Sequence, residues 1–353
     1  MSALSSTSRP VLRPTLRRVL LVKTSSLGDV VHNLPVVDDL HRALPGVTVD
    51  WLVEQAFAEV PALHPGVHDV IPCALRRWRS RPWAAESRSG WRGMRARLSA
   101  HPYDLVVDTQ GLLKSALLAR LATGPSAGFD RSSVRELLAT HFYQRVYPVP
   151  RTLHALERNR QLVALAAGYT LDGPPSYGLQ LRDGGAAAGR PGAGSGADVG
   201  GDWDGRSPFV VLLHATARAE KLWPESAWIA LGCALRDRLG LRTVIPWGSD
   251  SERVRAERLA AAIPGARVPP RSGLADLARG LAQAAVVIGV DTGLLHLASA
   301  VGVRCIGIYV ATDPARNGLY PASVGLNLGG VSNVPGPDEV LAAVVQVTAG
   351  QAA

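Results

Sequence analysis

The chain has 353 residues, of which 47% are hydrophobic and 19% charged, so it can bury large apolar cores and is not disordered overall. Three scattered cysteines form no paired framework, and no apolar run approaches the ~20 residues of a membrane span. Length and composition therefore predict two domains in a cytosolic protein. The formal net charge of +9 leaves nucleic acid, an anionic membrane surface or an acidic substrate open as partners.

The surplus of positive charge lies entirely in the first half of the chain. Residues 1–160 hold 22 Lys and Arg against 13 Asp and Glu, whereas residues 161–353 hold 16 of each sign. Eight arginines and one glutamate fall between residues 76 and 97. Any strongly anionic partner is therefore expected to meet the first half of the chain.

Short apolar runs alternate with helical stretches along the chain, which predicts parallel sheets covered by helices on both faces. The predicted strands are residues 19–22, 104–108, 209–213, 243–245, 285–288 and 303–309, the last of these being the final strand. The helices are expected to begin near residues 29, 112, 224, 250, 274 and 292.

The fold class is α/β, with two doubly wound, Rossmann-like domains on either side of a Gly/Ala-rich stretch. We predict a disordered extension (1–17), an N-terminal α/β domain (18–180), a flexible linker (181–207), a C-terminal α/β domain (208–335) and a C-terminal helix (336–353). For the last helix, packing back on the N-terminal domain is one option. Ligands bind at the carboxyl ends of strands in such sheets, so the loops there are the candidate sites.

The loop at residues 23–29, KTSSLGD, follows the first predicted strand. The Ser25 and Ser26 hydroxyls and the N–H groups freed around Gly28 suit the polar oxygens of a ligand. Asp29 falls near a helix N-terminus, where the dipole favours the ionised form that a general base requires. A plain helix cap is the structural alternative, and the sequence leaves both open.

Two loops of the second half place polar side chains at helix starts. Lys221 lies just before a helix, so its ammonium and the helix N–H groups can share one phosphate; a solvated surface lysine is the alternative. Asp291 is expected at an N-cap, with the N–H groups of Thr292 and Gly293 facing an anion. His296 shares a helix face with Thr292, and helix capping with a packed histidine is the alternative.

Residues 76–83, RRWRSRPW, interleave arginines with tryptophans. This pattern suits phosphates, carboxylates or a membrane interface. It also suits the stacking of nucleic-acid bases, or a solvated loop. A D-x-D sequence at residues 202–204 lies inside the Gly-rich stretch and predicts no metal site.

Six stretches together resemble the bacterial heptosyltransferases of lipopolysaccharide core assembly, and most closely the type I members. They are VKTSSLGDVVHNLP (22–35), RRWR (76–79), DTQGLLKSA (108–116), HAT…KLWPE (214–225), PWG…E (246–252) and VDTGLLHL (290–297). The stretches occur in family order over nearly the whole chain outside the linker. All three lysines of this Arg-rich chain lie within them.

The resemblance implies a GT-B glycosyltransferase architecture with the active-site cleft between the domains. It implies inverting transfer of L-glycero-D-manno-heptose from ADP-heptose, a co-substrate, to the first Kdo of Kdo2–lipid A, with no cofactor and no metal. The N-terminal domain is then acceptor-binding and the C-terminal domain ADP-heptose-binding. The implied partners are ADP-heptose, Kdo2–lipid A and the cytoplasmic face of a Gram-negative inner membrane, bound peripherally, with no nucleic acid.

The same resemblance implies roles for individual residues. Asp29 is the expected catalytic base. The expected donor-binding residues are Thr216, Lys221, Glu252, Asp291, Thr292, Gly293 and His296. The expected acceptor-binding residues are Ser25, Ser26, Gly28, Arg76, Arg77, Arg79 and Arg135.

Three alternatives remain open at the level of the sequence. One is a related heptosyltransferase of type II, which uses a heptose acceptor. Another is a nucleotide-sugar epimerase with the same two-domain architecture. The third is a basic protein that binds membranes or nucleic acid, although no recognised nucleic-acid motif supports it.

Overall fold

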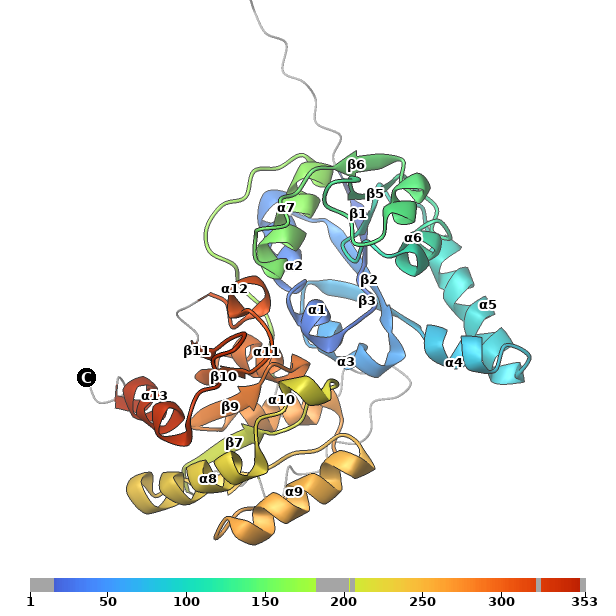
Figure 1. Ribbon diagram of the computed structural model, residues 1–353. Coiled ribbons are helices and arrows are strands. Elements are labelled where there is room, and N and C mark those ends of the chain that lie inside the picture. The colour runs from blue at the N-terminus through green and yellow to red at the C-terminus, as the bar shows by residue number, and fades with distance from the viewer. Residues whose placement is uncertain (1–15, 182–202, 204–206, 322–324, 350–353) are drawn as a thin grey trace, which may run out of the picture.

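The computed structural model describes residues 16–181, 203, 207–321 and 325–349. Two α/β domains, each built on one parallel sheet, lie one above the other in Figure 1. The predicted fold class of two doubly wound α/β domains is therefore confirmed. Most of the predicted extension (1–17) and linker (181–207), including both aspartates of the D-x-D sequence, lies outside the described residues.

The first domain holds a six-stranded parallel sheet in the order β3-β2-β1-β4-β5-β6. The strands are β1 (Arg18–Val22), β2 (Thr48–Glu54), β3 (Val67–Cys73), β4 (Leu105–Asp108), β5 (Ser126–Phe129) and β6 (Arg145–Tyr147). The strand order reverses between β1 and β4, so the loops that follow these strands diverge and leave a crevice at the carboxyl edge. The KTSSLGD loop follows β1 and therefore lies at this switch point.

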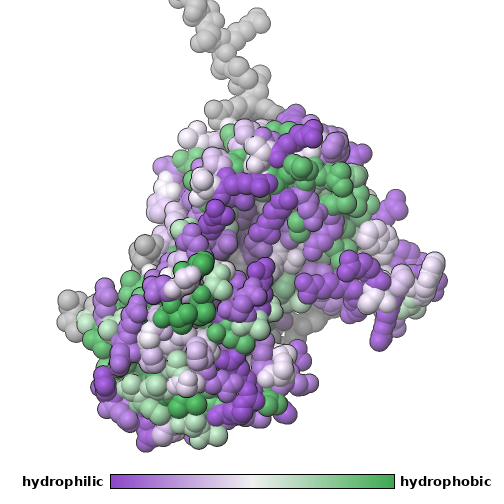
Figure 2. Space-filling model, in the orientation of Figure 1, coloured by the Kyte–Doolittle hydropathy of each residue, from purple (hydrophilic) through white to green (hydrophobic). Residues whose placement is uncertain are grey.

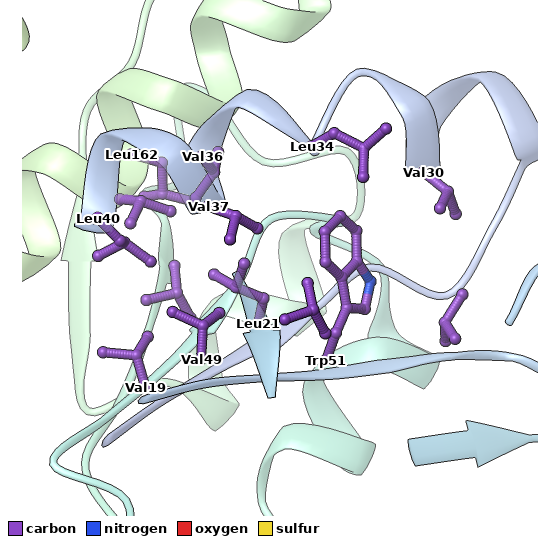
Figure 3. Close-up of a cluster of buried hydrophobic side chains, with 14 of the residues drawn as sticks. Val19, Leu21, Val30, Leu34, Val36, Val37, Leu40, Val49, Trp51 and Leu162 are labelled. Carbon is purple, nitrogen blue, oxygen red and sulfur yellow. The ribbon is translucent and has the colours of Figure 1, made fainter. Parts of the chain in front are cut away.

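Helices cover both faces of the first sheet. One face carries α1 (Leu27–Val31), α2 (Pro35–Ala43) and α7 (Ala155–Ala167), and the other carries α4 (Leu75–Ser80), α5 (Ala85–Ser99) and α6 (Leu113–Ala119). Short α3 (Glu59–Ala62) packs beside β3. Figure 3 shows Leu21 and Trp51 of the strands meeting Leu34 and Val37 of the helical layer. Burial on both faces explains why β1 is continuously apolar.

The second domain holds a five-stranded parallel sheet in the order β11-β10-β9-β7-β8. The strands are β7 (Phe209–Leu213), β8 (Arg242–Val244), β9 (Val286–Val290), β10 (Cys305–Tyr309) and β11 (Gly325–Gly329). Here the order reverses between β7 and β9. The loops carrying Lys221 and Asp291 follow these two strands and therefore meet at the second switch point.

Helices also cover both faces of the second sheet. One face carries α8 (Glu225–Leu239), α9 (Asp250–Ala262) and α13 (Pro337–Ala349), and the other carries α10 (Leu274–Ala282) and α11 (Gly293–Ala300). The option that the C-terminal helix packs back on the N-terminal domain is wrong. Val340 and Val344 of α13 are buried in the core of the second domain, beside α8, so its apolar face is already covered.

Several short elements are absent from the sequence prediction. Strands β2, β3, β5 and β6 were not predicted, and the expectation that residues 303–309 form the last strand is wrong, because β11 follows and pairs with β10. The β11 sequence GLNLG is rich in Gly and Asn, which are depleted in strands. The segment therefore forms a strand because it hydrogen-bonds to β10, and not because its residues favour strands.

The two domains touch where α1 meets α11, near the middle of Figure 1. A Cβ atom on Gly293 would lie 2.6 Å from the Cβ of Leu27 and 2.8 Å from the Gly28 nitrogen. A Cβ atom on Gly28 would lie 2.9 Å from Cδ2 of His296. Only glycine permits this approach, which brings the switch points of the two sheets face to face.

A second contact between the domains lies at α7 and α12 (Pro314–Asn317). The ring of His154 stacks on that of Tyr320, with centroids 4.6 Å apart, and its Nε2 lies 3.2 Å from the Gly318 carbonyl oxygen. The Tyr177 hydroxyl donates to the Tyr320 carbonyl oxygen at 2.7 Å. Figure 2 shows a hollow between the two domains that is bordered largely by hydrophilic residues.

Candidate active site

The KTSSLGD loop is held against the loop that follows β4 by the side chain of Gln110. Gln110 Oε1 accepts hydrogen bonds from the Thr24 N–H at 2.7 Å, from Thr24 Oγ1 at 2.9 Å and from the Ser25 N–H at 3.2 Å. Its Nε2 group donates to the Ser25 carbonyl oxygen at 2.6 Å. This amide clamp crosses the switch point and supports the polar groups of Ser25 rigidly.

Asp29 lies in the first turn of α1, three residues after the N-cap residue Ser26. Its Oδ2 accepts from the Ser26 N–H at 3.1 Å and from Ser26 Oγ at 3.2 Å, while Oδ1 pairs with Arg135 Nη2 at 3.2 Å. Burial raises the pKa of Asp29, but the charges of Lys23 and Arg135 and the hydrogen bonds from Ser26 lower it below its usual value. Asp29 therefore caps its helix and also presents an ionised carboxylate.

Lys23 is the buried cation of this loop, with only 4% of the residue exposed. Its Nζ donates to the Thr109 carbonyl oxygen at 2.7 Å and to Asn159 Oδ1 at 3.3 Å. Burial lowers the pKa of Lys23 to about 8, and Asp29 is the carboxylate that most favours its charged form. At neutral pH the lysine is therefore mostly charged and holds Asp29 in its ionised state.

Arg135, Arg151 and Arg158 form a second group of cations, and Arg135 joins this group to Asp29. Arg135 contacts Asp29, and Arg158 Nη2 donates to the Ser133 carbonyl oxygen at 2.6 Å. Arg151 Nη2 donates to the Val134 carbonyl oxygen, so the three arginines gather around residues 133–135. Burial, together with the charges of Arg135 and Arg151, lowers the pKa of Arg158. Of these three arginines, only Arg135 forms an ion pair among the described residues, so the group can attract an anionic ligand.

The arginines of the RRWR stretch lie elsewhere on the domain. Arg76, Arg77 and Arg79 are exposed on α4, and Arg77 Nη2 donates to Gln55 Oε1 at 3.0 Å. Within the described residues, none of these three arginines makes a polar contact with the KTSSLGD loop. The structure therefore brings Arg135 to Asp29 but does not bring the RRWR arginines to it.

In the second domain, Asp291 is contacted by the predicted residues Lys221 and Thr216, and also by Thr312, which was not predicted. Lys221 Nζ pairs with Asp291 Oδ2 at 2.5 Å, and Thr312 Oγ1 donates to the same oxygen at 2.8 Å. Thr216 Oγ1 donates to the Asp291 carbonyl oxygen at 3.0 Å. The Lys221 side chain is only 16% exposed, so it is not a solvated surface lysine. The pair fixes an ammonium at the second switch point.

Helix α11 begins directly after this ion pair. The N-cap residue is Thr292, and the prediction that Asp291 occupies the N-cap is wrong by one position, because Asp291 is held outside the helix by Lys221 and Thr312. Gly293 is the first helical residue. The first N–H groups of a helix have no partner within the helix, so this end is suited to an anion.

His296, one turn into α11, is buried against the first domain. Its Nδ1 lies 3.2 Å from Nε2 of His32, which ends α1, so one ring donates its N–H and the other accepts. Burial lowers the pKa of His296 to about 4, against the opposing effect of the Asp291 and Asp29 carboxylates. His296 is therefore uncharged at neutral pH and connects the two domains by a neutral hydrogen bond.

Glu252 is occupied at the start of α9. Its Oε2 accepts from the Gly248 N–H at 2.7 Å and from the Ser249 N–H at 3.3 Å, and Ser249 Oγ accepts from the Glu252 N–H at 3.3 Å. This is a reciprocal cap of the helix N-terminus. Glu252 follows β8, and within the described part of the chain it makes no polar contact with Lys221 or Asp291. Its role toward a nucleotide therefore stays a prediction.

Comparison with known proteins gives a consistent family. The sequence profile of glycosyltransferase family 9 (heptosyltransferase) matches residues 91–337. Lipopolysaccharide heptosyltransferase 1 of Pseudomonas aeruginosa is 47% identical over 311 residues, which are 87% of this chain and 82% of that protein. The chain belongs to glycosyltransferase family 9.

Solved structures agree with this assignment. The E. coli heptosyltransferase WaaC with ADP matches with a TM-score of 0.80 and 37% identity, covering 95% of this chain and 100% of that chain. The same enzyme with ADP-2-deoxy-2-fluoro heptose matches with a TM-score of 0.76 and 36% identity, over the same shares. The resemblance stated from the sequence and the GT-B architecture that it implied are confirmed for this family 9 glycosyltransferase.

Several residues of the site were not predicted from the sequence of this family 9 glycosyltransferase. Gln110, Asn159 and His32 are ordinary polar residues in the sequence, and their importance comes from partners on other elements. The sequence could have identified Lys23 as a site residue, since it is one of only three lysines and directly follows an apolar strand. Gly28 is buried against α11, and its expected contact with the acceptor stays a prediction.

Replacing Lys23 by methionine is expected to raise the pKa of Asp29. The substitution keeps an apolar stem of similar length but removes the charge that most strongly opposes the effect of burial on this carboxyl. The pKa can be measured by carbon-13 NMR titration of the aspartate carboxyl carbons, with Asp29→Asn identifying the resonance.

Lys114→Met is the matched control for this titration. Lys114 is exposed and donates to Ser25 Oγ at 3.4 Å, but it is not among the charges that set the pKa of Asp29. The control is expected to leave the Asp29 titration in place. An unchanged titration in Lys23→Met would show that Arg135 and Ser26 suffice to keep Asp29 ionised.

Proposed function

We propose that this protein transfers L-glycero-D-manno-heptose from ADP-heptose to the first Kdo of Kdo2–lipid A, with inversion, in lipopolysaccharide inner-core synthesis. The name of the P. aeruginosa relative and the ADP and ADP-heptose analogue in the WaaC structures support the reaction and the donor. ADP-heptose is a co-substrate, and the proposal includes no further cofactor.

The observation that carries the proposal is the meeting of α1 and α11. It sets the ionised carboxylate of Asp29, in the first domain, opposite the start of α11 and the Lys221–Asp291 pair of the second. One side can therefore accept a proton while the other holds an anion. Transfer of a sugar from a nucleoside diphosphate sugar requires a group that accepts a proton and a group that binds the leaving diphosphate.

Asp29 acts as the general base in this mechanism. Its carboxylate takes the proton of the acceptor hydroxyl as that oxygen attacks the anomeric carbon from the face opposite ADP. The bond from the anomeric carbon to the acceptor oxygen forms while the bond to the diphosphate oxygen breaks, and ADP leaves with the negative charge. The low pKa of Asp29 keeps it in the basic form over the neutral range.

Lys221 and the N–H groups at Thr292 and Gly293 stabilise the charge that develops on the leaving diphosphate. Asp291 holds the ammonium in place before the donor binds, so little reorganisation is needed when charge develops. His296 is neutral and can hydrogen-bond the donor without adding charge. ADP is already a good leaving group, and the mechanism therefore needs no general acid.

The positive patch of Arg135, Arg151 and Arg158 is proposed to meet the carboxylate groups of the Kdo acceptor. None of the helices in the described ranges is long and apolar enough to cross a bilayer. Because the proposed acceptor is held in a membrane by its acyl chains, the reaction is assigned to the cytoplasmic face of the inner membrane of a Gram-negative bacterium, with peripheral binding.

Incubation with ADP-heptose and deacylated Kdo2–lipid A, followed by mass spectrometry, tests the reaction. One added heptose is the expected product. Transfer only to an acceptor that already carries heptose would assign the protein to the type II enzymes. Turnover of the nucleotide sugar with no acceptor present would favour an epimerase instead.

Asp29→Asn is expected to lower kcat by about 10²–10⁴-fold, because an amide cannot accept the proton of the acceptor hydroxyl. The affinity for ADP is expected to stay close to that of the wild type, since Asp29 lies on the acceptor side. Initial rates and titration calorimetry measure the two quantities. Near-normal turnover in this variant would remove Asp29 from the role of base.

Lys221→Met is expected to weaken ADP binding by about 10- to 100-fold, the range for losing a charge-assisted hydrogen bond. The loss also leaves the Asp291 carboxylate without its ammonium partner next to the diphosphate. Calorimetric titration with ADP measures the change, with Lys114→Met as the control lysine. An unchanged affinity would refute the assignment of Lys221 to the diphosphate.

A further inference from the structure

Helices α4 and α5 form a projection from the first domain, at the right of Figure 1. We call α4, α5 and the turn between them the α4–α5 projection (residues 75–99). Trp83, in the turn, is 85% exposed, and Trp91, on α5, is 38% exposed. An indole with almost all of its surface in water has a large apolar area and no partner within the described part of the chain.

The projection is also strongly basic. Arg77 is hydrogen-bonded to Gln55 and Arg97 is paired with Asp69, and Glu86 is the single acidic residue of the segment. The remaining six arginines have no carboxylate partner among the described residues, and all are exposed: Arg76, Arg79, Arg81, Arg88, Arg92 and Arg95. A surface with this charge attracts an extended anionic partner.

A hollow lies between the two helices of the projection. Its volume is about 700 Å³, and it is lined by Trp78, Pro82, Ala85, Ser87, Arg88, Trp91 and Arg92. Trp78 and Trp91 pack edge to face with ring centroids 5.8 Å apart. The indole rings form an apolar wall beside the Arg88 and Arg92 guanidinium groups, which suits an amphiphile with an anionic head.

We propose that the α4–α5 projection docks on the surface of an anionic phospholipid bilayer, with Trp83 in the interfacial region and the exposed arginines on the lipid phosphates. Indole rings favour the membrane interface, and arginines extend their charged groups to the headgroups. Single-stranded nucleic acid fits less well. Stacking of successive bases needs several open aromatic faces, whereas Trp78 and Trp91 are packed against each other.

The position of the projection agrees with the proposed reaction. Helix α4 follows the end of β3, and Arg77 joins it to Gln55, directly after β2, so the projection lies at the carboxyl edge of the first sheet. The KTSSLGD loop with Asp29 begins at the same edge. Docking here holds the first domain beside lipid-anchored acceptors. This consequence rests on the proposed function, whereas docking itself does not.

Flotation of the full chain with vesicles tests the docking. The vesicles are made of phosphatidylcholine alone or of phosphatidylcholine mixed with phosphatidylglycerol. The test variants are Trp83→Ser and the double variant Arg88→Ser/Arg92→Ser. The matched controls lie on exposed positions of the second domain: Val254→Ser for the apolar side chain and Arg236→Ser/Arg238→Ser for the same loss of charge.

The wild type and both controls are expected to bind the anionic vesicles and to leave the neutral ones unbound. Each arginine near an anionic surface contributes about fivefold in affinity, so Arg88→Ser/Arg92→Ser is expected to weaken binding about 25-fold at low salt. Trp83→Ser is expected to reduce binding at every salt concentration, since its contribution is apolar. Equal binding by test and control variants would overturn the proposal.

Two other outcomes identify a different occupant. A gel shift of single-stranded nucleic acid at physiological salt, lost in Arg88→Ser/Arg92→Ser, without vesicle binding would assign the projection to nucleic acid. The wild type could also fail to bind vesicles while the variants show a raised KM for acylated acceptor in detergent. That result would make the projection an acceptor subsite. Either outcome replaces membrane docking.

Activity on the water-soluble, deacylated acceptor separates this inference from the proposed function. All of these variants are expected to keep the wild-type kcat on that acceptor, because none of the substituted residues belongs to the proposed site. Vesicle binding without any heptosyl transfer would leave docking in place and remove the proposed function. Transfer without vesicle binding would leave the heptosyl transfer in place and remove both docking and the peripheral binding proposed above.

Discussion

The close approach of α1 and α11 through Gly28 and Gly293 sets the position of one domain relative to the other. Any side chain at either glycine would meet the neighbouring helix or the ring of His296 at less than 3 Å. Each helix begins at the switch point of its own sheet, where a parallel α/β fold binds ligands. The glycine contact therefore joins two separate ligand-binding edges into one site between the domains.

The electrostatics of the site follow from this arrangement, because each domain contributes one carboxylate with its own cations. Lys23 and Arg135 keep Asp29 ionised, so it can accept a proton, whereas Lys221 neutralises Asp291 and leaves the start of α11 free for an anion. The uncharged His32–His296 contact separates the two groups. Because each carboxylate is balanced by the cations of its own domain, the Asp29 carboxylate and the start of α11 can lie close together without Asp29 pairing with Lys221.

Much of the fold was predictable because the central strands are fully buried. Strands β1, β4, β7 and β9 read as continuous apolar runs, and each is followed by a loop of polar residues that the sequence analysis placed correctly. The edge strands β6 and β11 are partly exposed and poor in such runs, so they were missed. The buried strands β2 and β5 were also missed, because Asp50 interrupts the apolar run of β2 and Ser126 and Gly128 that of β5. Helix α13 was assigned to the wrong neighbour as one option, since an apolar face does not specify what covers it.

The sequence by itself determined which residue types follow each central strand and where the positive charge lies along the chain. It also determined the family to which the chain belongs. These properties are local or additive, so they can be read from neighbouring residues. Only the tertiary structure decided that Lys23 is buried on Asn159 and that His32 meets His296, 264 positions away. It also separated the RRWR arginines from Asp29. Contacts of this kind depend on how helices and sheets pack, and no local pattern encodes them.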